Sequence, residues 1–141
     1  MSSSSIQELR RRIDGVEESY EFMLAYAAQG LLTHESSGNG SQLLEFLNRT
    51  HETLGQLAEL FERVIEEAGS TPRDGYLDFV EVIREDARKA GAAVRLAMIQ
   101  PKISSQLIDN LNASIHLRAV LTDIFLLDEI ISPRALVAKA G

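Results

Sequence analysis

The 141-residue chain contains neither cysteine nor tryptophan. Without cysteine it cannot form disulfide bridges, thiolate metal sites or a cysteine nucleophile. The absence agrees with a reducing compartment, and the first residues show no apolar signal segment, so we expect a cytoplasmic protein. Its most hydrophobic late stretch, 124–131, is short and contains Asp128 and Glu129, so contact with a membrane is not expected.

Positive charge is also scarce. The chain carries 14 Lys and Arg residues against 21 Asp and Glu residues, which gives a formal net charge of -7. Proteins that bind the phosphate backbone generally present basic surfaces, so nucleic acid is not expected as a partner.

Apolar side chains at helical spacing are what the chain has in abundance. Its length and its hydrophobic fraction of 45% are those of one folded domain, predicted here over residues 1–141. Residues three and four positions apart share one face of an α-helix, and such rows recur in four segments. No segment alternates with period two, so no strand is expected. The predicted helices span about 5–32, 41–68, 72–99 and 102–131, followed by a short tail over 133–141.

Capping and helix-breaking residues mark the ends of these segments. Ser5 and Glu8 have the spacing of a capping box at the start of the first helix. Thr71 and Pro72 are typical of a helix start, with threonine as the N-cap. Pro101 either ends the third helix or bends it, and the sequence leaves both open. Short links between long helices favour an all-α antiparallel four-helix bundle, and the same spacing allows a helix-swapped dimer.

Two predicted helices carry more apolar surface than one buried face requires. In the first, Phe22 and Tyr26 lie nearly opposite the core row. In the last, a second apolar row lies beside the row of Leu121 and Phe125, and it consists of Val120, Ile124, Leu127 and Ile131. Helices with two apolar sides are either central in a fold or covered by another subunit. We therefore predict both sets as interaction residues of a homo-oligomer, with a dimer favoured, or of a site for a protein partner.

Two arginines in the later helices are candidates for binding an anion. Arg118 falls inside a predicted apolar row, between Leu111 and Leu121, where a guanidinium needs an acceptor. It either binds a carboxylate or phosphate in a cavity, pairs with a glutamate of a neighbouring helix, or extends its head to water. Arg88 lies at the edge of the predicted core of the third helix and can pair with Glu85 along the same helix.

Metal and phosphate motifs are missing from the sequence. It contains neither Glu-x-x-His nor His-Glu-x-x-His, and His51 and His116 each lie without a partner motif. Neither G-x-S-x-G nor a phosphate-binding loop occurs. We therefore predict no metal site and no cofactor.

The first helix carries the pattern Leu-Arg-x-x-Ile-Asp over residues 9–14. This segment resembles the opening helix of the AroQ-type, all-helical chorismate mutases. The resemblance covers this helix alone, and segment 27–30 has no basic residue where that family has its second basic position. It implies that Arg10 contacts a substrate carboxylate across an intertwined dimer, in a rearrangement promoted by positioning and electrostatics. Arg10, Arg88 and Arg118 would then line one pocket.

Surplus apolar surface without a catalytic set of residues favours association over catalysis. We expect a non-enzymatic helical-bundle interaction protein, a regulatory, adaptor or accessory subunit that self-associates or binds a protein partner. The alternative is a helical enzyme for a small dicarboxylate, similar to the chorismate mutases. The two hypotheses differ in whether the three arginines converge.

Overall fold

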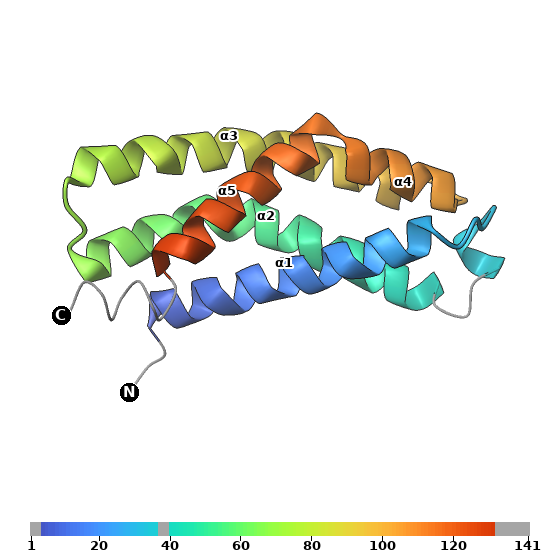
Figure 1. Ribbon diagram of the computed structural model, residues 1–141, viewed down its shortest axis with the longest axis horizontal. Coiled ribbons are helices and arrows are strands. Elements are labelled where there is room, and N and C mark those ends of the chain that lie inside the picture. Colours follow the sequence, from blue (N-terminus) through green and yellow to red (C-terminus); the bar gives the residue numbers. More distant parts are fainter. Residues whose placement is uncertain (1–3, 37–39, 132–141) are drawn as a thin grey trace.

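The computed structural model describes residues 4–36 and 40–131, and in these ranges its regular structure is entirely helical (Figure 1). The prediction of an all-α fold is confirmed. The predicted tail over 133–141 lies outside the described residues. The helices are α1 (Ser5–Ala27), the 3₁₀ helix η1 (His34–Ser36), α2 (Gly40–Ala68), α3 (Arg73–Met98), α4 (Ser105–Ala113) and α5 (Ile115–Ile131).

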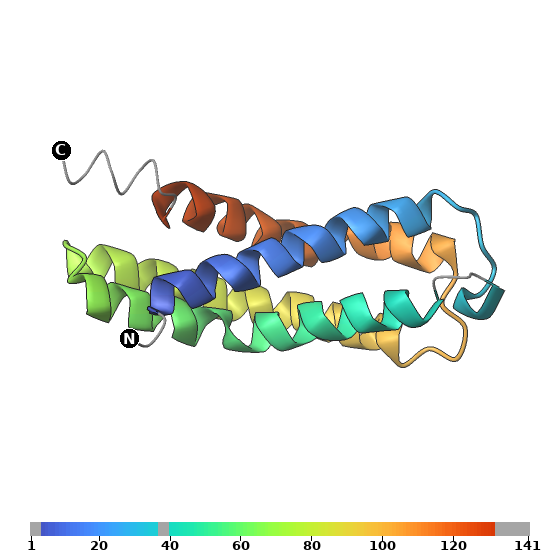
Figure 2. The same ribbon diagram turned by 90° about the horizontal axis from the view of Figure 1, so that it is seen from below.

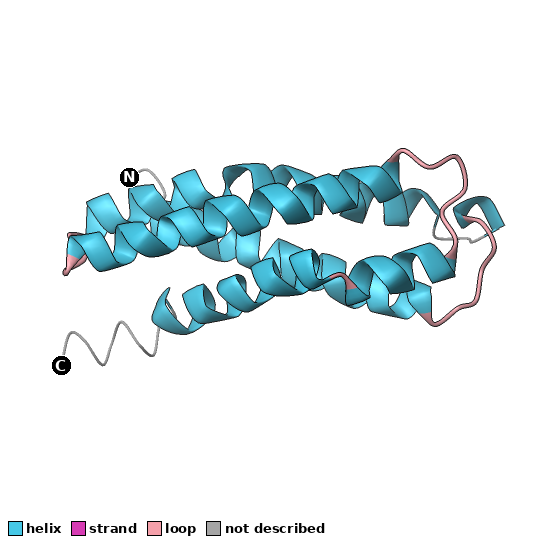
Figure 3. Ribbon diagram, turned by 90° about the horizontal axis from the view of Figure 1, so that it is seen from above, coloured by secondary structure: helices cyan, strands magenta, loops and turns pink. Residues whose placement is uncertain are grey.

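The helices lie side by side along the long axis of an elongated molecule (Figure 1, Figure 2). α2 packs against both α1 and α3, α3 also packs against α5, and α4 packs mainly against α1. The N–H and hydroxyl of Ser5 donate to the carboxylate of Glu67, and Arg10 donates to the carbonyl of Ile131. The start of α1 therefore lies beside the ends of α2 and α5. Seen from above, the loops between the long helices lie at the ends of the molecule (Figure 3).

One hydrophobic cluster runs through all five α-helices. It is built from the rows that helical spacing predicts, because residues three and four apart share a face. Burial of this surface is the main stabilising contribution, at about 25 cal/mol per Å² of apolar area. Among its buried members are Leu9, Ile13 and Met23 in α1, Leu43, Leu47 and Phe61 in α2, Val80, Ile83 and Val94 in α3, Ile108 in α4, and Leu117 and Leu121 in α5.

The first helix has a different N-cap and an earlier end than the sequence predicts. Ser4, rather than Ser5, is its N-cap: the Ser4 hydroxyl accepts from the Gln7 N–H, and the Gln7 side chain accepts from the Ser4 N–H. The helix ends at Ala27 instead of extending to about residue 32. Gly30 follows with a φ of 69°, a left-handed conformation that takes the chain off the helical path.

Prolines flank both ends of α3. Pro72 occupies the N-cap position that was predicted for Thr71, so the helix starts one residue later than expected. α3 ends at Met98, and Pro101 lies in the loop that follows. Ser104 then caps α4 by accepting from the Leu107 N–H. Pro101 therefore separates two helices and does not bend a continuous one.

The last predicted helix is broken in two at Ser114. This residue adopts a φ of -58° and a ψ of 131°, an extended conformation that cannot continue a helix. Its hydroxyl accepts from the backbone N–H of His116, as an N-cap serine does. α4 packs mainly on α1, whereas α5 packs mainly on α3. Because Ser114 leaves the helical path, α5 is rotated about its axis relative to a continuous helix. The apolar row of α4 therefore does not continue into α5 as predicted.

A buried joint ties the end of α1 to the segment before α4. The hydroxyl of the fully buried Tyr26 donates to the carbonyl of Ile103 at 2.5 Å. The Ser105 hydroxyl donates to the Tyr26 carbonyl at 2.7 Å and accepts from the Leu31 N–H at 2.9 Å. The Ser105 N–H donates to the Leu31 carbonyl, and the Ile103 N–H donates to Nδ1 of His34. These bonds satisfy backbone groups that the end of a helix leaves unpaired.

Candidate functional site

The three arginines predicted to bind an anion lie apart. Arg10 donates to the Ile131 carbonyl from Nε at 3.1 Å and from its terminal nitrogen at 2.5 Å, which caps the C-terminus of α5. Arg118 is exposed on α5, thirteen residues before Ile131 and so about 20 Å away along the helix. Arg88 is exposed on α3 and donates to Glu85 at 2.8 Å. The prediction that the three line one pocket is therefore wrong for the single chain.

Most of the predicted interaction residues belong to the core. Tyr26 is fully buried, and the ring of the half-buried Phe22 packs 4.7 Å from that of Phe46. The break at Ser114 turns the predicted outer row of α5 inward and leaves Phe125 exposed. The buried residues of that row are Val120, Ile124, Leu127 and Ile131. The prediction that these residues form an outer apolar face is wrong.

Exposed apolar side chains gather instead where α3 and α5 lie beside each other. Val82 is 44% exposed, Leu126 51% and Ile130 40%. The half-buried Phe79 lines a hollow together with Ile130, which places these two residues side by side. The two helices run in opposite directions, so residue numbers rise along α3 where they fall along α5. Counting from the pair of Phe79 and Ile130, Val82 lies about level with Leu126. We name these four residues the α3/α5 face.

A buried carboxyl group lies in the same seam between α3 and α5. Asp123 of α5 is only 6% exposed, and its carboxyl group lies beside that of Asp86 of α3. Burial, together with the hydrogen bond and charge of Asp86, raises the pKa of Asp123 to about 7. The Oδ2 atom of Asp123 has no hydrogen-bond partner in the part of the chain that the structure describes. We name these two residues the acid pair.

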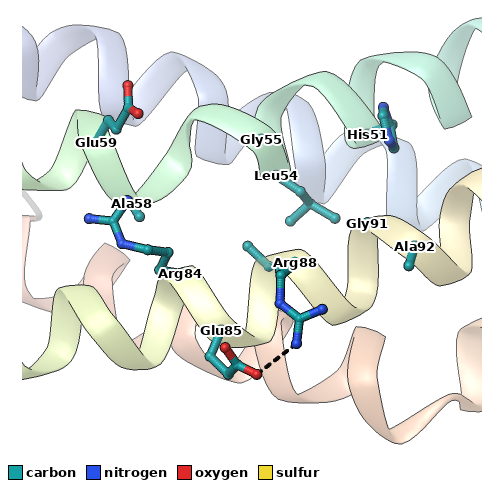
Figure 4. Close-up of a pocket in the computed structure, with 11 residues that line it drawn as sticks. His51, Leu54, Gly55, Ala58, Glu59, Arg84, Glu85, Arg88, Gly91 and Ala92 are labelled. Atoms are coloured by element: carbon teal, nitrogen blue, oxygen red, sulfur yellow. Dashed lines mark hydrogen bonds and ion pairs between the residues drawn. The ribbon is translucent and has the colours of Figure 1, made fainter.

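A groove of about 410 Å³ runs between α2 and α3 (Figure 4). Arg88 turns toward Glu85 in Figure 4, and Arg84 pairs with Glu62 at 3.3 Å. Both arginines on the rim are therefore engaged by glutamates. The floor is formed by small and apolar residues, which include Leu54, Gly55, Ala58, Ala87 and Gly91.

The groove has room for a side chain at its glycines. A Cβ atom added at Gly91 meets no atom within 4 Å. Alanine is favoured over glycine inside a helix by about 1 kcal/mol, so we expect Gly91→Ala to raise the free energy of unfolding by about that amount. Urea denaturation measures the change. Gly69→Ala is the matched control, and its φ of 60° should make the same replacement destabilising by about 1 kcal/mol. Equal effects at the two positions would contradict this expectation.

Two other kinds of site do not occur within residues 4–36 and 40–131. In these ranges no three His, Asp or Glu side chains come together as a metal ion would require. The helices described there are also too short or too polar to cross a membrane.

The sequence already carried a signal for the α3/α5 face. In α3, Phe79 and Val82 begin a row spaced by three and four residues that is separate from the buried row. Asp86 and Lys89 lie in the middle of this row, and these charges hide its apolar character in the sequence. The α5 part of the face became recognisable only once the break at Ser114 had set the rotation of that helix.

Comparisons with protein families, with curated proteins and with solved structures find no match to this chain. The candidate functional site therefore rests on the chain's own side chains, and it consists of the α3/α5 face with the acid pair in its seam.

Proposed function

We propose that this chain is an association module that binds a second copy of itself, or a protein partner, through the α3/α5 face. In this proposal it serves as a regulatory, adaptor or accessory subunit and not as an enzyme. The observation that carries the proposal is the exposure of Val82, Leu126 and Ile130 within one face. Contiguous apolar patches larger than a few hundred Å² are rare on monomeric proteins, and covering apolar surface is favourable by about 25 cal/mol per Å².

The proposed scaffold is an antiparallel four-helix bundle in which α4 and α5 together occupy the fourth position. The bond from Arg10 to the Ile131 carbonyl and the bond from Tyr26 to the Ile103 carbonyl support this arrangement, since they join opposite ends of α1 to opposite ends of the α4 and α5 segment. The face is formed by two helices that pack against each other, α3 and α5.

The polar contacts of the arginines support binding over catalysis. Arg10 caps a helix, while Arg84 and Arg88 pair with glutamates. These guanidinium groups already serve the fold. A substrate anion would have to displace a partner at each of them.

The test is light scattering on a size-exclusion column across a dilution series. We expect the wild-type chain to approach twice its mass of 15.6 kDa at high concentration and to fall toward one mass on dilution. The variant Leu126→Ser with Ile130→Ser should weaken association by at least about tenfold, because it removes two exposed apolar contacts from the centre of the face. Its circular dichroism should remain helical, since neither side chain is part of the core.

Leu24→Ser is the matched control, because Leu24 is similarly exposed but lies on α1, outside the face. It should associate like the wild type. If the wild-type chain has one mass at every concentration, self-association is excluded. Association that is equally strong in all three proteins would exclude the α3/α5 face as its site.

A further inference from the structure

The α3 helix carries a second row of residues outside its buried one. Consecutive members are three or four positions apart, which is the a/d spacing of a coiled coil. The row lies on the side of α3 that faces α5 and solvent, and all its members are partly or fully exposed. We name it the outer row, and its members are Phe79, Val82, Asp86, Lys89, Ala93 and Leu96.

The outer row is complementary to itself when two copies run antiparallel. About a two-fold axis between Ala87 and Arg88, each a position lies opposite a d position of the other copy. Phe79 then packs against Leu96 of the second copy, and Val82 against Ala93 of the second copy. The layers on both sides of the axis are therefore apolar, with two large side chains in the outer layer and a valine against an alanine in the inner one.

The charges of the row select this antiparallel orientation. Asp86 and Lys89 are its two charged members, and the two-fold axis passes between them. Each Asp86 therefore faces Lys89 of the second copy, and symmetry repeats the pair. In a parallel arrangement Asp86 would face Asp86 of the second copy and Lys89 would face Lys89, and both contacts are repulsive.

The acid pair supplies an independent reason for a cation at this place. No ion pair in the described part of the chain reaches Asp86 or Asp123, and Oδ2 of Asp123 has no hydrogen-bond partner there. Lys89 of the same chain lies 3.7 Å from Glu85, and Arg118 of α5 is exposed and turned outward. Two adjacent carboxyl groups at one seam are stabilised by an ammonium group, and residues 4–36 and 40–131 of the same chain provide none there.

We propose that two copies of this chain pair antiparallel along the outer row of α3, with Lys89 of each copy against the acid pair of the other. The proposal rests on the proposed function, because it specifies the partner and the register of the α3/α5 face. The same pairing brings the second copy over Phe79 and Val82, the two residues that α3 contributes to the α3/α5 face.

Cysteine cross-linking tests the register, because the chain has no cysteine of its own. Val82→Cys and Ala93→Cys are prepared separately, mixed and oxidised mildly. We expect the mixture to form disulfide-linked dimers on a non-reducing gel, whereas Val82→Cys alone remains unlinked. In the antiparallel register the two copies of position 82 are eleven residues apart along α3, about 16 Å, while a disulfide spans Cα atoms up to about 7 Å apart.

Charge exchange tests the contact itself. Asp86→Lys and Lys89→Asp should each raise the dissociation constant of the dimer by about tenfold, since each places like charges opposite one another. The double variant should return to within about threefold of the wild type. Arg95→Asp is the control, because this exposed residue of α3 lies outside the outer row, and it should leave the constant unchanged.

The outcomes separate this pairing from the proposed function. A wild-type chain that is dimeric by light scattering, but whose cysteine mixture does not cross-link, would overturn the pairing and leave the proposed function standing. Efficient cross-linking of Val82→Cys alone would also overturn it. Failure of the double charge variant to recover would exclude the contact between Lys89 and the acid pair. A chain that is monomeric at every concentration overturns the pairing together with self-association.

Discussion

Replacing Tyr26 with serine is expected to lower the free energy of unfolding by about 3–5 kcal/mol, the cost of removing a fully buried large side chain. The replacement leaves a cavity beside the core and takes away the donor of the Ile103 carbonyl. Domains are typically stable by about 5–15 kcal/mol, so a large part of the stability would be lost. Urea denaturation followed by circular dichroism measures the loss.

Two further variants separate the ring from the hydroxyl group. Tyr26→Phe keeps the packing and removes the bond to Ile103, so about 1–2 kcal/mol should be lost. Phe22→Ser removes a half-buried ring that packs on Phe46, and it should cost less than Tyr26→Ser. If Tyr26→Ser and Phe22→Ser were equally stable, the buried contacts of Tyr26 would not add the expected stability to the fold.

Replacing Asp123 with asparagine is expected to stabilise the fold at pH 8 by about 2–3 kcal/mol. The pKa of Asp123 is about 7 in the folded chain, against an ordinary value of 3.8. The folded state therefore holds the proton more tightly than the unfolded state. The stability that this proton confers is complete below about pH 4 and is lost as the pH rises through 7. The full shift corresponds to about 4 kcal/mol, which solvent screening reduces.

The measurement is the free energy of unfolding between pH 5 and pH 8, taken at low protein concentration so that single chains are observed. The wild type should lose about 2 kcal/mol more than Asp123→Asn over this interval. Asp109→Asn, at an exposed position of α4, should follow the wild type. If the free energy of unfolding changed with pH equally in the wild type and in Asp123→Asn, the acid pair would not be the origin of the pH dependence. In the proposed pair, Lys89 of the second copy would offset part of this cost, so the pH dependence of stability should weaken as the protein concentration rises.

The buried face of each long helix could be predicted from the sequence, because helical period alone determines which residues share a side. In α1 the apolar residues that recur at helical spacing are buried, as Leu9, Ile13 and Met23 illustrate. The period also predicted the second and third helices to within a few residues at each end. Local spacing therefore accounts for most of the fold.

The candidate site could not be predicted in the same way, because it depends on a single residue and on contacts distant in sequence. The apolar period alone runs through Ser114 as in one continuous helix, and it predicts Arg118 on the inner side and Ile124 on the outer side. The extended backbone of Ser114 reverses both placements. The contact between Asp86 and Asp123 joins residues 37 positions apart, and no local pattern indicates such a pair.

The break at Ser114 also divides the last part of the chain into two helices that need not open together. Cooperativity along a helix passes through its continuous ladder of backbone hydrogen bonds, and this ladder is interrupted between α4 and α5. α4 remains anchored on α1, while α5 is held mainly by α3. Local opening of α5 would therefore uncover the acid pair while α4 stays on α1, so the proposed association seam depends on α5 remaining in place.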